Sequence, residues 1–511
     1  MQIPSLASLR LRPELIFESD HLSENLSSRT ARGGFTNLIA QVCSFSVQTV
    51  STILLARILL PDDYGLVAMV SVFIGLAAVF KDAGLSVATV QRDEISEAQL
   101  STVFWINIAL LLVVGGCVIA ASPLVAAFYK RPELTGVTVA LGLAFILNGL
   151  SVQHDALLRR HMLFRAVAVT QVLPIVLSLA ASLALALWGW RYWALVTGTM
   201  VVAVTSTSLS FYFCPWRPKR IERRTGARSM LRFGLDLTGF NAANYFARNA
   251  DNVLIGKFVG ADALGLYGKA YSLFMLPIGQ IRTPINDVAI PALSALKRQP
   301  ARYRSYYLTV VGIVGLVTVP LALYCALEGD FLIRFLLGPN WAGAAPVFRI
   351  LSVVGVLQTV SSTSGLVLIT LGRTRRYMSQ GLVTSGVTVA AFIVGLRYGI
   401  IGVAIAYAVV SFLMLLPVLA WCFHGTPVSV RNFLGGIWRP LAYGGTATLA
   451  GYLIGRLGSG HWLLDHTLEA VVFFGIYSLL VSRSRALRDV WRPITAAIGL
   501  EFGVQSGQPR R

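Results

Sequence analysis

Four polar residues between positions 241 and 251 are spaced so that their side chains share one face of a helix. Asn241, Asn244, Arg248 and Asp251 follow one another at intervals of three, four and three residues, and residues so spaced are neighbours on a helix surface. They lie in an apolar stretch, where an arginine is costly and therefore indicates a function such as binding an anion. Asp251 lies one turn from Arg248 and could instead serve only to neutralise its charge.

A second polar stripe lies 200 residues earlier, at Gln41, Ser44, Gln48 and Ser51, and Asn37 extends it by one turn. Polar side chains that face lipid are costly, so we expect both stripes to face a cavity inside the protein. For the earlier stripe, hydrogen bonding between neighbouring helices is an equally good explanation.

Three further cations in apolar surroundings, Lys81, Lys269 and Arg282, are candidate cavity residues. Arginine binds phosphate through two parallel hydrogen bonds, and lysine binds it as a point charge. A cavity lined by several cations therefore suits an anionic substrate, such as one that carries phosphate. By contrast, Arg57 and Lys257 lie near the ends of their apolar segments, where long side chains reach the membrane surface.

Asp62 and Asp63 form an acidic pair in a short turn, and membrane glycosyltransferases often hold a catalytic acid in their first outer loop. The matching turn 200 residues later, however, holds Asp262 in the same place. An aspartate that is repeated before a glycine and a helix is better explained as a helix N-cap. The outer loops are also too short to form a catalytic domain.

Sequence patterns typical of metal, nucleotide and disulfide chemistry are missing. The five cysteines are scattered, with no CxxC spacing, and the six histidines form no HExxH motif, so we expect neither disulfides nor a metal site. No GxxxxGK[ST] motif occurs, so the chain carries no P-loop for ATP hydrolysis. We therefore expect a protein that needs no cofactor and catalyses no covalent chemistry.

The composition indicates which elements hold these residues. Of 511 residues, 55% are hydrophobic and 13% are charged, whereas about 25% charged residues are usual in soluble proteins. This excludes a soluble enzyme, a disordered chain and a fibrous protein, and it predicts an all-α polytopic membrane protein. We expect about fourteen transmembrane helices, at 33–58, 64–90, 99–121, 134–153, 163–187, 192–213, 230–258, 263–292, 303–327, 343–371, 377–396, 400–423, 432–455 and 462–482.

The net charge of +20 mainly reports orientation. Arginine and lysine gather in the loops after the fourth, sixth, eighth and tenth expected helices and after the last one, and the alternate loops hold few of them. This positive-inside pattern predicts that both termini are cytoplasmic. Residues 1–32 show no signal-peptide pattern, which agrees with that orientation. The basic stretch 217–232 is then a cytoplasmic linker and not a nucleic-acid site.

The chain contains an internal repeat. Residues 54–66 match residues 254–266 at an offset of 200, which pairs Arg57 with Lys257 and Gly65 with Gly265. The first six expected helices therefore resemble the next six, and both sets begin on the same side, so the repeats are parallel. We predict two six-helix lobes around a central cavity, followed by two C-terminal helices. The expected divisions are a cytoplasmic segment at 1–32, an N-lobe with its basic linker at 33–228, a C-lobe at 229–424, and the last two helices with a cytoplasmic tail at 425–511.

Several short motifs, taken in their order and spacing, resemble those of the Wzx-type lipopolysaccharide and exopolysaccharide flippases, and most of all their WzxC-like branch. The longest is RNADNVLIGKFVG at 248–260, which continues through ALGLY at 263–267 and KAY at 269–271. Further motifs are LAR at 55–57, YGLVAM at 64–69, PALS at 291–294, LGPNW at 337–341, AP at 345–346, SS at 361–362 and LGR at 371–373. The resemblance covers roughly residues 30–425. These flippases belong to the multidrug/oligosaccharidyl-lipid/polysaccharide exporter superfamily.

The resemblance implies two lobes around a cationic cavity in a bacterial inner membrane. It implies that the chain moves an undecaprenyl-diphosphate-linked oligosaccharide to the periplasmic leaflet by alternating access, with a proton or sodium gradient as a candidate energy source and polysaccharide polymerase and chain-length machinery as candidate partners. The expected roles are binding of diphosphate by Arg248 with Lys81, Lys269 or Arg282, and binding of sugar hydroxyls by Asn37, Gln41, Gln48, Asn241 and Asn244.

Three alternatives stay open at this point. A multidrug or small-cation exporter of the same superfamily would be expected to hold buried carboxylates and aromatic residues in its cavity rather than an arginine. A peptidoglycan-precursor flippase differs only in its lipid-linked substrate. A membrane glycosyltransferase or polymerase is less consistent with the internal repeat and the short outer loops.

Overall fold

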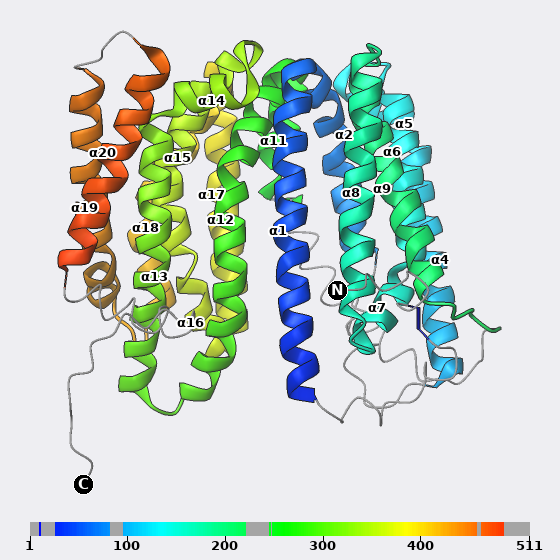
Figure 1. The fold of residues 1–511 in the computed structure, drawn as a ribbon, viewed down its shortest axis with the longest axis horizontal. Coiled ribbons are helices and arrows are strands. Elements are labelled where there is room, and N and C mark those ends of the chain that lie inside the picture. The colour runs from blue at the N-terminus through cyan, green and yellow to red at the C-terminus, as the bar shows by residue number, and fades with distance from the viewer. Residues whose placement is uncertain are drawn as a thin grey trace, which may run out of the picture. The chain divides into compact units, whose positions relative to one another are not determined.

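A computed structural model of the chain describes residues 10–11, 26–81, 96–220, 245–246, 248–456 and 461–484. In these ranges the secondary structure is helical throughout, with no strand (Figure 1). The all-α fold class predicted from the composition is therefore confirmed. The chain divides into two compact units, one of residues 1–268 with 336–341 and the other of residues 269–335 with 342–511.

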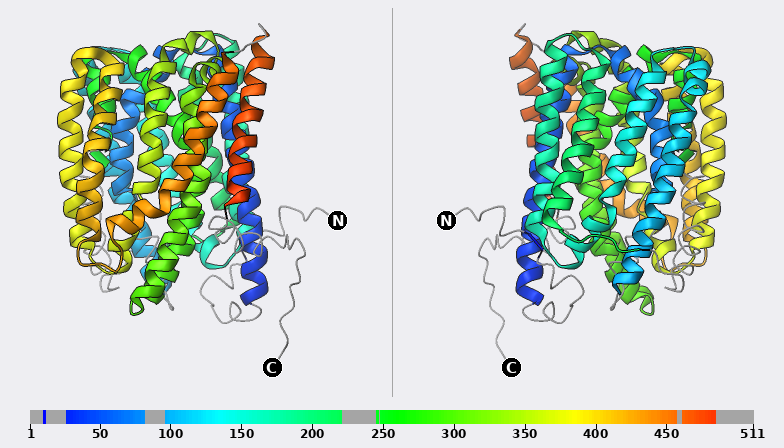
Figure 2. Two further views of the ribbon diagram at one scale, coloured as in Figure 1. Left: turned by 90° about the vertical axis from the view of Figure 1, so that its left-hand side faces the viewer. Right: turned by 90° about the vertical axis from the view of Figure 1, so that its right-hand side faces the viewer.

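The first unit is built mainly from helices that are long and apolar. Its helices are α1 (Leu26–Ile58), α2 (Pro61–Phe80), α4 (Glu97–Ala120), α5 (Ser122–Tyr129), α6 (Leu134–Leu150), α7 (Val152–Arg160), α8 (Phe164–Leu187), α9 (Tyr192–Phe213) and α11 (Ala250–Phe258), with the start of α12 (Ala261–Leu296). The pair α8 and α9 lies side by side (Figure 2) and is joined by a hydrogen bond from the Ser178 hydroxyl to the Gly198 carbonyl oxygen, at 2.9 Å.

The second unit contains the rest of α12 and the helices that follow. They are α13 (Pro300–Leu327), α14 (Gly329–Leu337), η4 (Pro339–Ala344), α15 (Ala345–Ser361), α16 (Ser364–Thr370), α17 (Thr374–Gly395), η5 (Leu396–Tyr398), α18 (Gly399–Phe423), α19 (Val430–Gly455) and α20 (Trp462–Arg483). The end of α14 and the start of η4 belong to the first unit. The last two helices, α19 and α20, lie side by side (Figures 1 and 2).

Ten segments in the described part of the chain are long and apolar enough to cross a membrane. One of them, Thr374–Phe423, contains both α17 and α18. The helices α12 and α19 cover two further expected spans but are not among the ten, and the expected span 230–258 lies largely outside the described residues. The multi-span character is thus confirmed, and the number fourteen stays a prediction, as do the lobe boundaries.

Within the first unit, the two repeated turns found in the sequence pack against each other. A Cβ atom added to Gly65 in α2 would lie 1.8 Å from the carbonyl oxygen of Ala261, and one added to Gly265 in α12 would lie 1.9 Å from that of Pro61. Each glycine therefore lets its helix approach the first turn of the other. The contact is reciprocal, because Gly65 and Gly265 are equivalent positions of the repeat and so are Pro61 and Ala261.

A tryptophan from a distant part of the sequence completes this region. Trp341 is fully buried, its indole N–H donates to the carbonyl oxygen of Ala56 at 2.7 Å, and its ring meets Tyr64 edge-on at 5.3 Å. A buried indole N–H needs such an acceptor. The segment 336–341 consequently packs with the first repeat although it follows α13 in the sequence.

Candidate functional site

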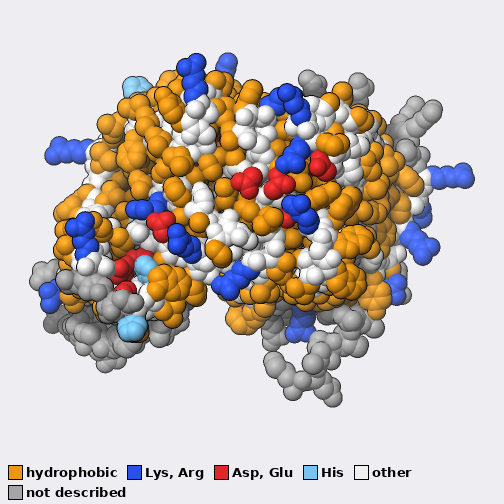
Figure 3. Space-filling view, turned by 90° about the horizontal axis from the view of Figure 1, so that it is seen from above, with side chains coloured by type: hydrophobic (Ala, Val, Ile, Leu, Met, Phe, Trp, Pro, Cys, Tyr) orange, Lys and Arg blue, Asp and Glu red, His pale blue; other side chains and the backbone are white. Residues whose placement is uncertain are grey.

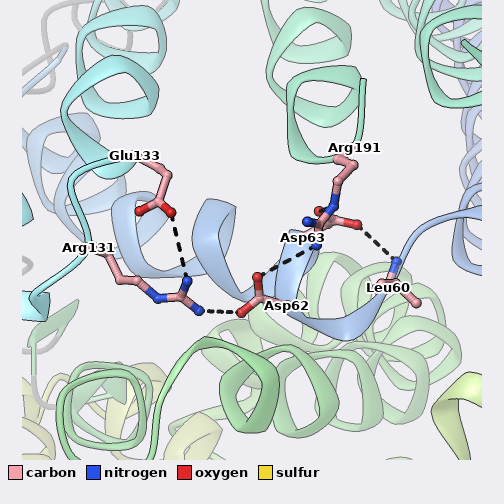
Figure 4. Close-up of polar contacts among 6 residues, drawn as sticks. All are labelled: Leu60, Asp62, Asp63, Arg131, Glu133 and Arg191. Atoms are coloured by element: carbon pink, nitrogen blue, oxygen red, sulfur yellow. Dashed lines mark hydrogen bonds and ion pairs between the residues drawn. The ribbon is translucent and has the colours of Figure 1, made fainter. Parts of the chain in front are cut away.

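The acidic turn before α2 is held by two arginines (Figure 4). Asp62 accepts a hydrogen bond from Arg131 at 2.6 Å, and Asp63 lies 3.1 Å from the guanidinium Nε of Arg191. The Asp63 side chain is almost fully buried, whereas Arg131 and Arg191 are partly exposed. These contacts tie the start of α2 to the segment after α5 and to the start of α9.

The N-cap role expected for this pair is wrong in detail. The N-cap residue is Leu60, and Pro61, Asp62 and Asp63 are the first three residues of the helix. Proline favours the first helical position because its missing N–H is not needed there, and this moves the aspartates into the first turn. From that turn, Asp63 accepts a hydrogen bond from the backbone N–H of Leu60 at 3.1 Å.

Arg191 holds this cluster with a backbone conformation that side-chain-bearing residues rarely adopt. Its φ of 45° lies in the left-handed region, which costs about 1–3 kcal/mol and persists only where neighbouring contacts hold it. Its ion pair with Asp63 is such a contact.

The face seen in Figure 3 carries Lys/Arg and Asp/Glu side chains close together on a largely hydrophobic surface.

A second polar group lies inside the first unit and includes a predicted cavity cation. Lys81 follows the last residue of α2 and donates a hydrogen bond to the side-chain oxygen of Asn148 in α6. The amide nitrogen of Asn148 in turn donates to the hydroxyl of Ser206 in α9, at 3.5 Å. Lys81 is partly buried. Its hydrogen bond to the Asn148 amide reduces the cost of removing the ammonium group from water.

The group continues to a carboxylate in α7. Asp155 accepts a hydrogen bond from Ser210 at 2.6 Å and one from Ser151 at 3.3 Å. Lys81 and Arg159 are close enough to attract it electrostatically. The helices α2, α6, α7 and α9 thus share one network that contains a cation, amides, hydroxyls and an anion, and this network can bind a polar group or hold the helices together.

Arg248 and Asp251 form no ion pair in the part of the chain that the structure describes. Arg248 is exposed, and in the described part of the chain its side chain makes no hydrogen bond or ion pair. Asp251, in the first turn of α11, is buried and accepts a hydrogen bond from the Tyr267 hydroxyl at 3.0 Å and another from the backbone N–H of Asn252. The proposed neutralisation of Arg248 by Asp251 is therefore wrong, because the carboxylate is turned toward Tyr267.

The structure describes only some of the remaining predicted site residues. Asn37, Gln41 and Gln48 lie on α1 and are exposed. Lys269 lies on α12 in the second unit and is partly buried. Asn241, Asn244 and the side chain of Arg282 lie outside the described residues. The structure describes the side chains of seven of the ten predicted residues, and the grouping of the ten into one site stays a prediction.

Sequence reasoning missed the partners of Lys81. Asn148 lies within an expected span, and Asp155 comes just after it, between His154 and the basic pair Arg159 and Arg160. Carboxylates so close to a membrane segment are rare and usually paired, so Asp155 is the sequence feature that indicates a nearby cation such as Lys81.

The fold is that of a known class of membrane transport proteins. The structure of the lipid II flippase MurJ in an inward closed conformation matches with a TM-score of 0.69 over 90% of this chain and 99% of that chain, at 13% identity. An inward-facing multidrug resistance transporter of the MATE family and MOP superfamily matches with a TM-score of 0.58 over 78% of this chain and 95% of that one, at 14% identity. The chain therefore has the fold of this superfamily.

The family itself is shown by the sequence comparison. The model of a family described as "Polysaccharide biosynthesis protein" matches residues 54–346, so the chain belongs to that family. It is 28% identical over 424 residues to the teichuronic acid biosynthesis protein TuaB of Bacillus subtilis, covering 82% of this chain and 83% of that protein. It is 25% identical over 451 residues to the lipopolysaccharide biosynthesis protein WzxC of Escherichia coli, covering 85% and 89%. The predicted resemblance is thereby confirmed.

Proposed function

We propose that this protein is a flippase that moves undecaprenyl-diphosphate-linked oligosaccharide repeat units to the outer leaflet for surface polysaccharide synthesis. The observation that carries the proposal is the match to the MurJ flippase fold over 90% of the chain, in a chain of the polysaccharide biosynthesis family. A further relative, 27% identical over 332 residues, is the succinoglycan biosynthesis transport protein ExoT of Rhizobium meliloti. Movement of an intact lipid-linked unit requires binding and conformational change, and no covalent step.

In this proposal, two cations of the first unit bind the diphosphate. Arg248 is exposed and unpaired within the described residues, so its five N–H donors are available to a ligand. Lys81 is oriented by Asn148 and adds a point charge. The exposed amides Asn37, Gln41 and Gln48 on α1 supply hydrogen bonds to sugar hydroxyls, and Lys269, Arg282, Asn241 and Asn244 are the corresponding candidates in the second repeat.

We further propose that the two repeats rock about the bound head group in an alternating-access cycle, while the lipid tail stays in the bilayer. The basic loops orient the protein in a bacterial inner membrane with both termini in the cytoplasm. A proton or sodium gradient supplies the energy, and the polysaccharide polymerase and chain-length machinery receive the product.

The test is a deletion strain of the organism that encodes this chain. Loss of the chain should abolish the surface polysaccharide and lead to accumulation of the lipid-linked repeat unit, and a plasmid copy of the wild-type chain should restore export. An Arg248→Ala copy should fail to restore it, while an Arg57→Ala copy, which changes a cation near the end of α1, should succeed. Export that is unchanged by deletion would contradict the proposal.

A further inference from the structure

Three side chains with metal-binding atoms converge at one end of the last helices in the second unit. Glu328 is the C-cap residue of α13, and His466 and Glu469 lie near the start of α20. The imidazole Nδ1 of His466 is 2.7 Å from Oε2 of Glu328 and 3.7 Å from Oε2 of Glu469. Within the described residues this is the one group of three or more such side chains whose ligand atoms all lie within 4.8 Å of one another.

Both carboxylates are buried, at 4% exposure for Glu328 and 8% for Glu469. No lysine or arginine pairs with either of them in the described part of the chain. Two carboxylates and one imidazole carry a net negative charge even when the imidazole is protonated, and a buried uncompensated charge is costly. With both carboxylates ionised, the cluster therefore holds a negative charge that no lysine or arginine balances in the described part of the chain.

The imidazole Nδ1 of His466 faces the carboxylates of both Glu328 and Glu469. Glu469 makes no hydrogen bond within the described residues, and Nδ1 of His466 lies within hydrogen-bond distance of Oε2 of Glu328. The imidazole ring stacks on Phe331 at 4.2 Å and meets Trp462 edge-on at 5.9 Å, and these two rings fix its orientation.

Glycine at the end of α19 makes room for one of the ligands. A Cβ atom on Gly455 would lie 2.0 Å from Oε1 of Glu469, so any larger residue would displace this carboxylate. The cluster thus depends on three helices, α13, α19 and α20, which meet at this end of the unit.

The ligand atoms lie near the spacing that a small tetrahedral ion requires. Bonds of about 2.0–2.2 Å to nitrogen and oxygen place tetrahedral ligand atoms about 3.3–3.6 Å apart. The 3.7 Å between His466 and Glu469 is close to that range, whereas the 2.7 Å between His466 and Glu328 is a hydrogen-bond distance that must widen by less than about 1 Å when an ion binds. Imidazole with carboxylates suits zinc and similar metals, whereas magnesium and calcium prefer oxygen alone.

We propose that Glu328, His466 and Glu469 form a binding site for a divalent transition-metal ion, with Zn²⁺ the best fit and water completing its coordination. The ion joins the end of α13 to the start of α20 and neutralises the two carboxylates. The site is independent of the proposed transport function, because none of its residues belongs to the predicted substrate site.

The proposal is tested by titrating ZnCl₂ into the full-length protein, purified in detergent and stripped with EDTA, in a calorimeter. We expect one Zn²⁺ per chain and no comparable heat from MgCl₂. His466→Ala and Glu469→Gln should weaken binding by more than about 10-fold. His461→Ala is the matched control, since His461 is the exposed N-cap residue of α20 and only its backbone contacts the helix.

Folding of each variant is checked by its elution profile and thermal transition, and Glu328→Gln offers a second variant of nearly unchanged shape. Replacement of Zn²⁺ by Co²⁺ gives a visible absorption band that should disappear in His466→Ala and persist in His461→Ala. Failure of the wild-type chain to bind Zn²⁺, or equal binding by the His466→Ala and His461→Ala variants, would overturn the proposal.

Discussion

Gly65 and Gly265 make the same contact from opposite sides: each faces the carbonyl oxygen of the first residue of the helix that carries the other. They are also equivalent positions of the sequence repeat, 200 residues apart. A repeat that is visible in the sequence thus reappears as a reciprocal helix crossing inside the first unit. The residue type is dictated by the distance between the backbones, which leaves no space for a side chain.

Replacing either glycine by alanine should strongly destabilise the first unit. The atom that a new Cβ would meet belongs to the backbone in both cases, at 1.8 and 1.9 Å, so the helices must move apart, at a cost of about 1–3 kcal/mol or more. Gly268→Ala is the control, because nothing lies within 4 Å of that position and alanine is the better helix former. Thermal unfolding in detergent should show lower midpoints for Gly65→Ala and Gly265→Ala and no loss for Gly268→Ala.

The buried carboxylate of Asp63 should matter more than an exposed one. Asp63→Asn leaves Arg191 without its close partner, and breaking a buried ion pair costs about 3–5 kcal/mol; because Arg191 is half-exposed, we expect the lower end of that range or less. Asp330 and Arg349 form a pair that is exposed on both sides, so Asp330→Asn should change the unfolding free energy by about 1 kcal/mol or less. Equal effects of the two substitutions in a denaturant titration would show that the Asp63 pair is not structural.

Lys81 should be required for export beyond its effect on folding. Lys81→Met removes the charge that we assign to the diphosphate, and charged hydrogen bonds are worth about 1.5–3 kcal/mol, so surface polysaccharide should fall by about 10-fold or more. Lys219→Met is the control, because Lys219 is exposed and paired with Glu97. Protein levels are measured by immunoblot. Normal export by Lys81→Met at wild-type protein levels would remove Lys81 from the site.

Stability should depend on pH through Glu328 when metal is removed by EDTA. Burial raises the pKa of this carboxyl above its ordinary value of 4.5, an effect that His466 partly opposes. The folded state therefore holds the proton more tightly than the unfolded state, so the stability from this group is complete below pH 4.5 and decreases as the pH rises through the raised pKa. The melting temperature of wild-type protein should fall over that range, and Glu328→Gln should flatten the curve. An identical slope in the variant would exclude Glu328 as its source.

The fold could be predicted largely from local signals, because apolar segments of spanning length are a property of composition alone. The repeat predicted that Gly65 and Gly265 are equivalent, but it did not predict that they touch. An aspartate N-cap would start the helix after Asp62 or Asp63, but the helix begins at Pro61, so Asp63 is its third residue. Side-chain partners far apart in sequence, such as Lys81 with Asn148 or Glu328 with His466, depend on helix packing, which no spacing rule describes.

The central claim is movement of a lipid-linked oligosaccharide across a bilayer, and reconstitution tests it most directly. The purified chain is placed in liposomes that contain labelled undecaprenyl-diphosphate oligosaccharide in both leaflets, and a lectin that cannot cross the membrane is added outside. We predict that the inner-leaflet pool becomes accessible to the lectin with the wild-type chain and stays protected with Arg248→Ala. An inner-leaflet pool that stays as protected with the wild-type chain as in protein-free liposomes, with and without a proton or sodium gradient, would contradict the account.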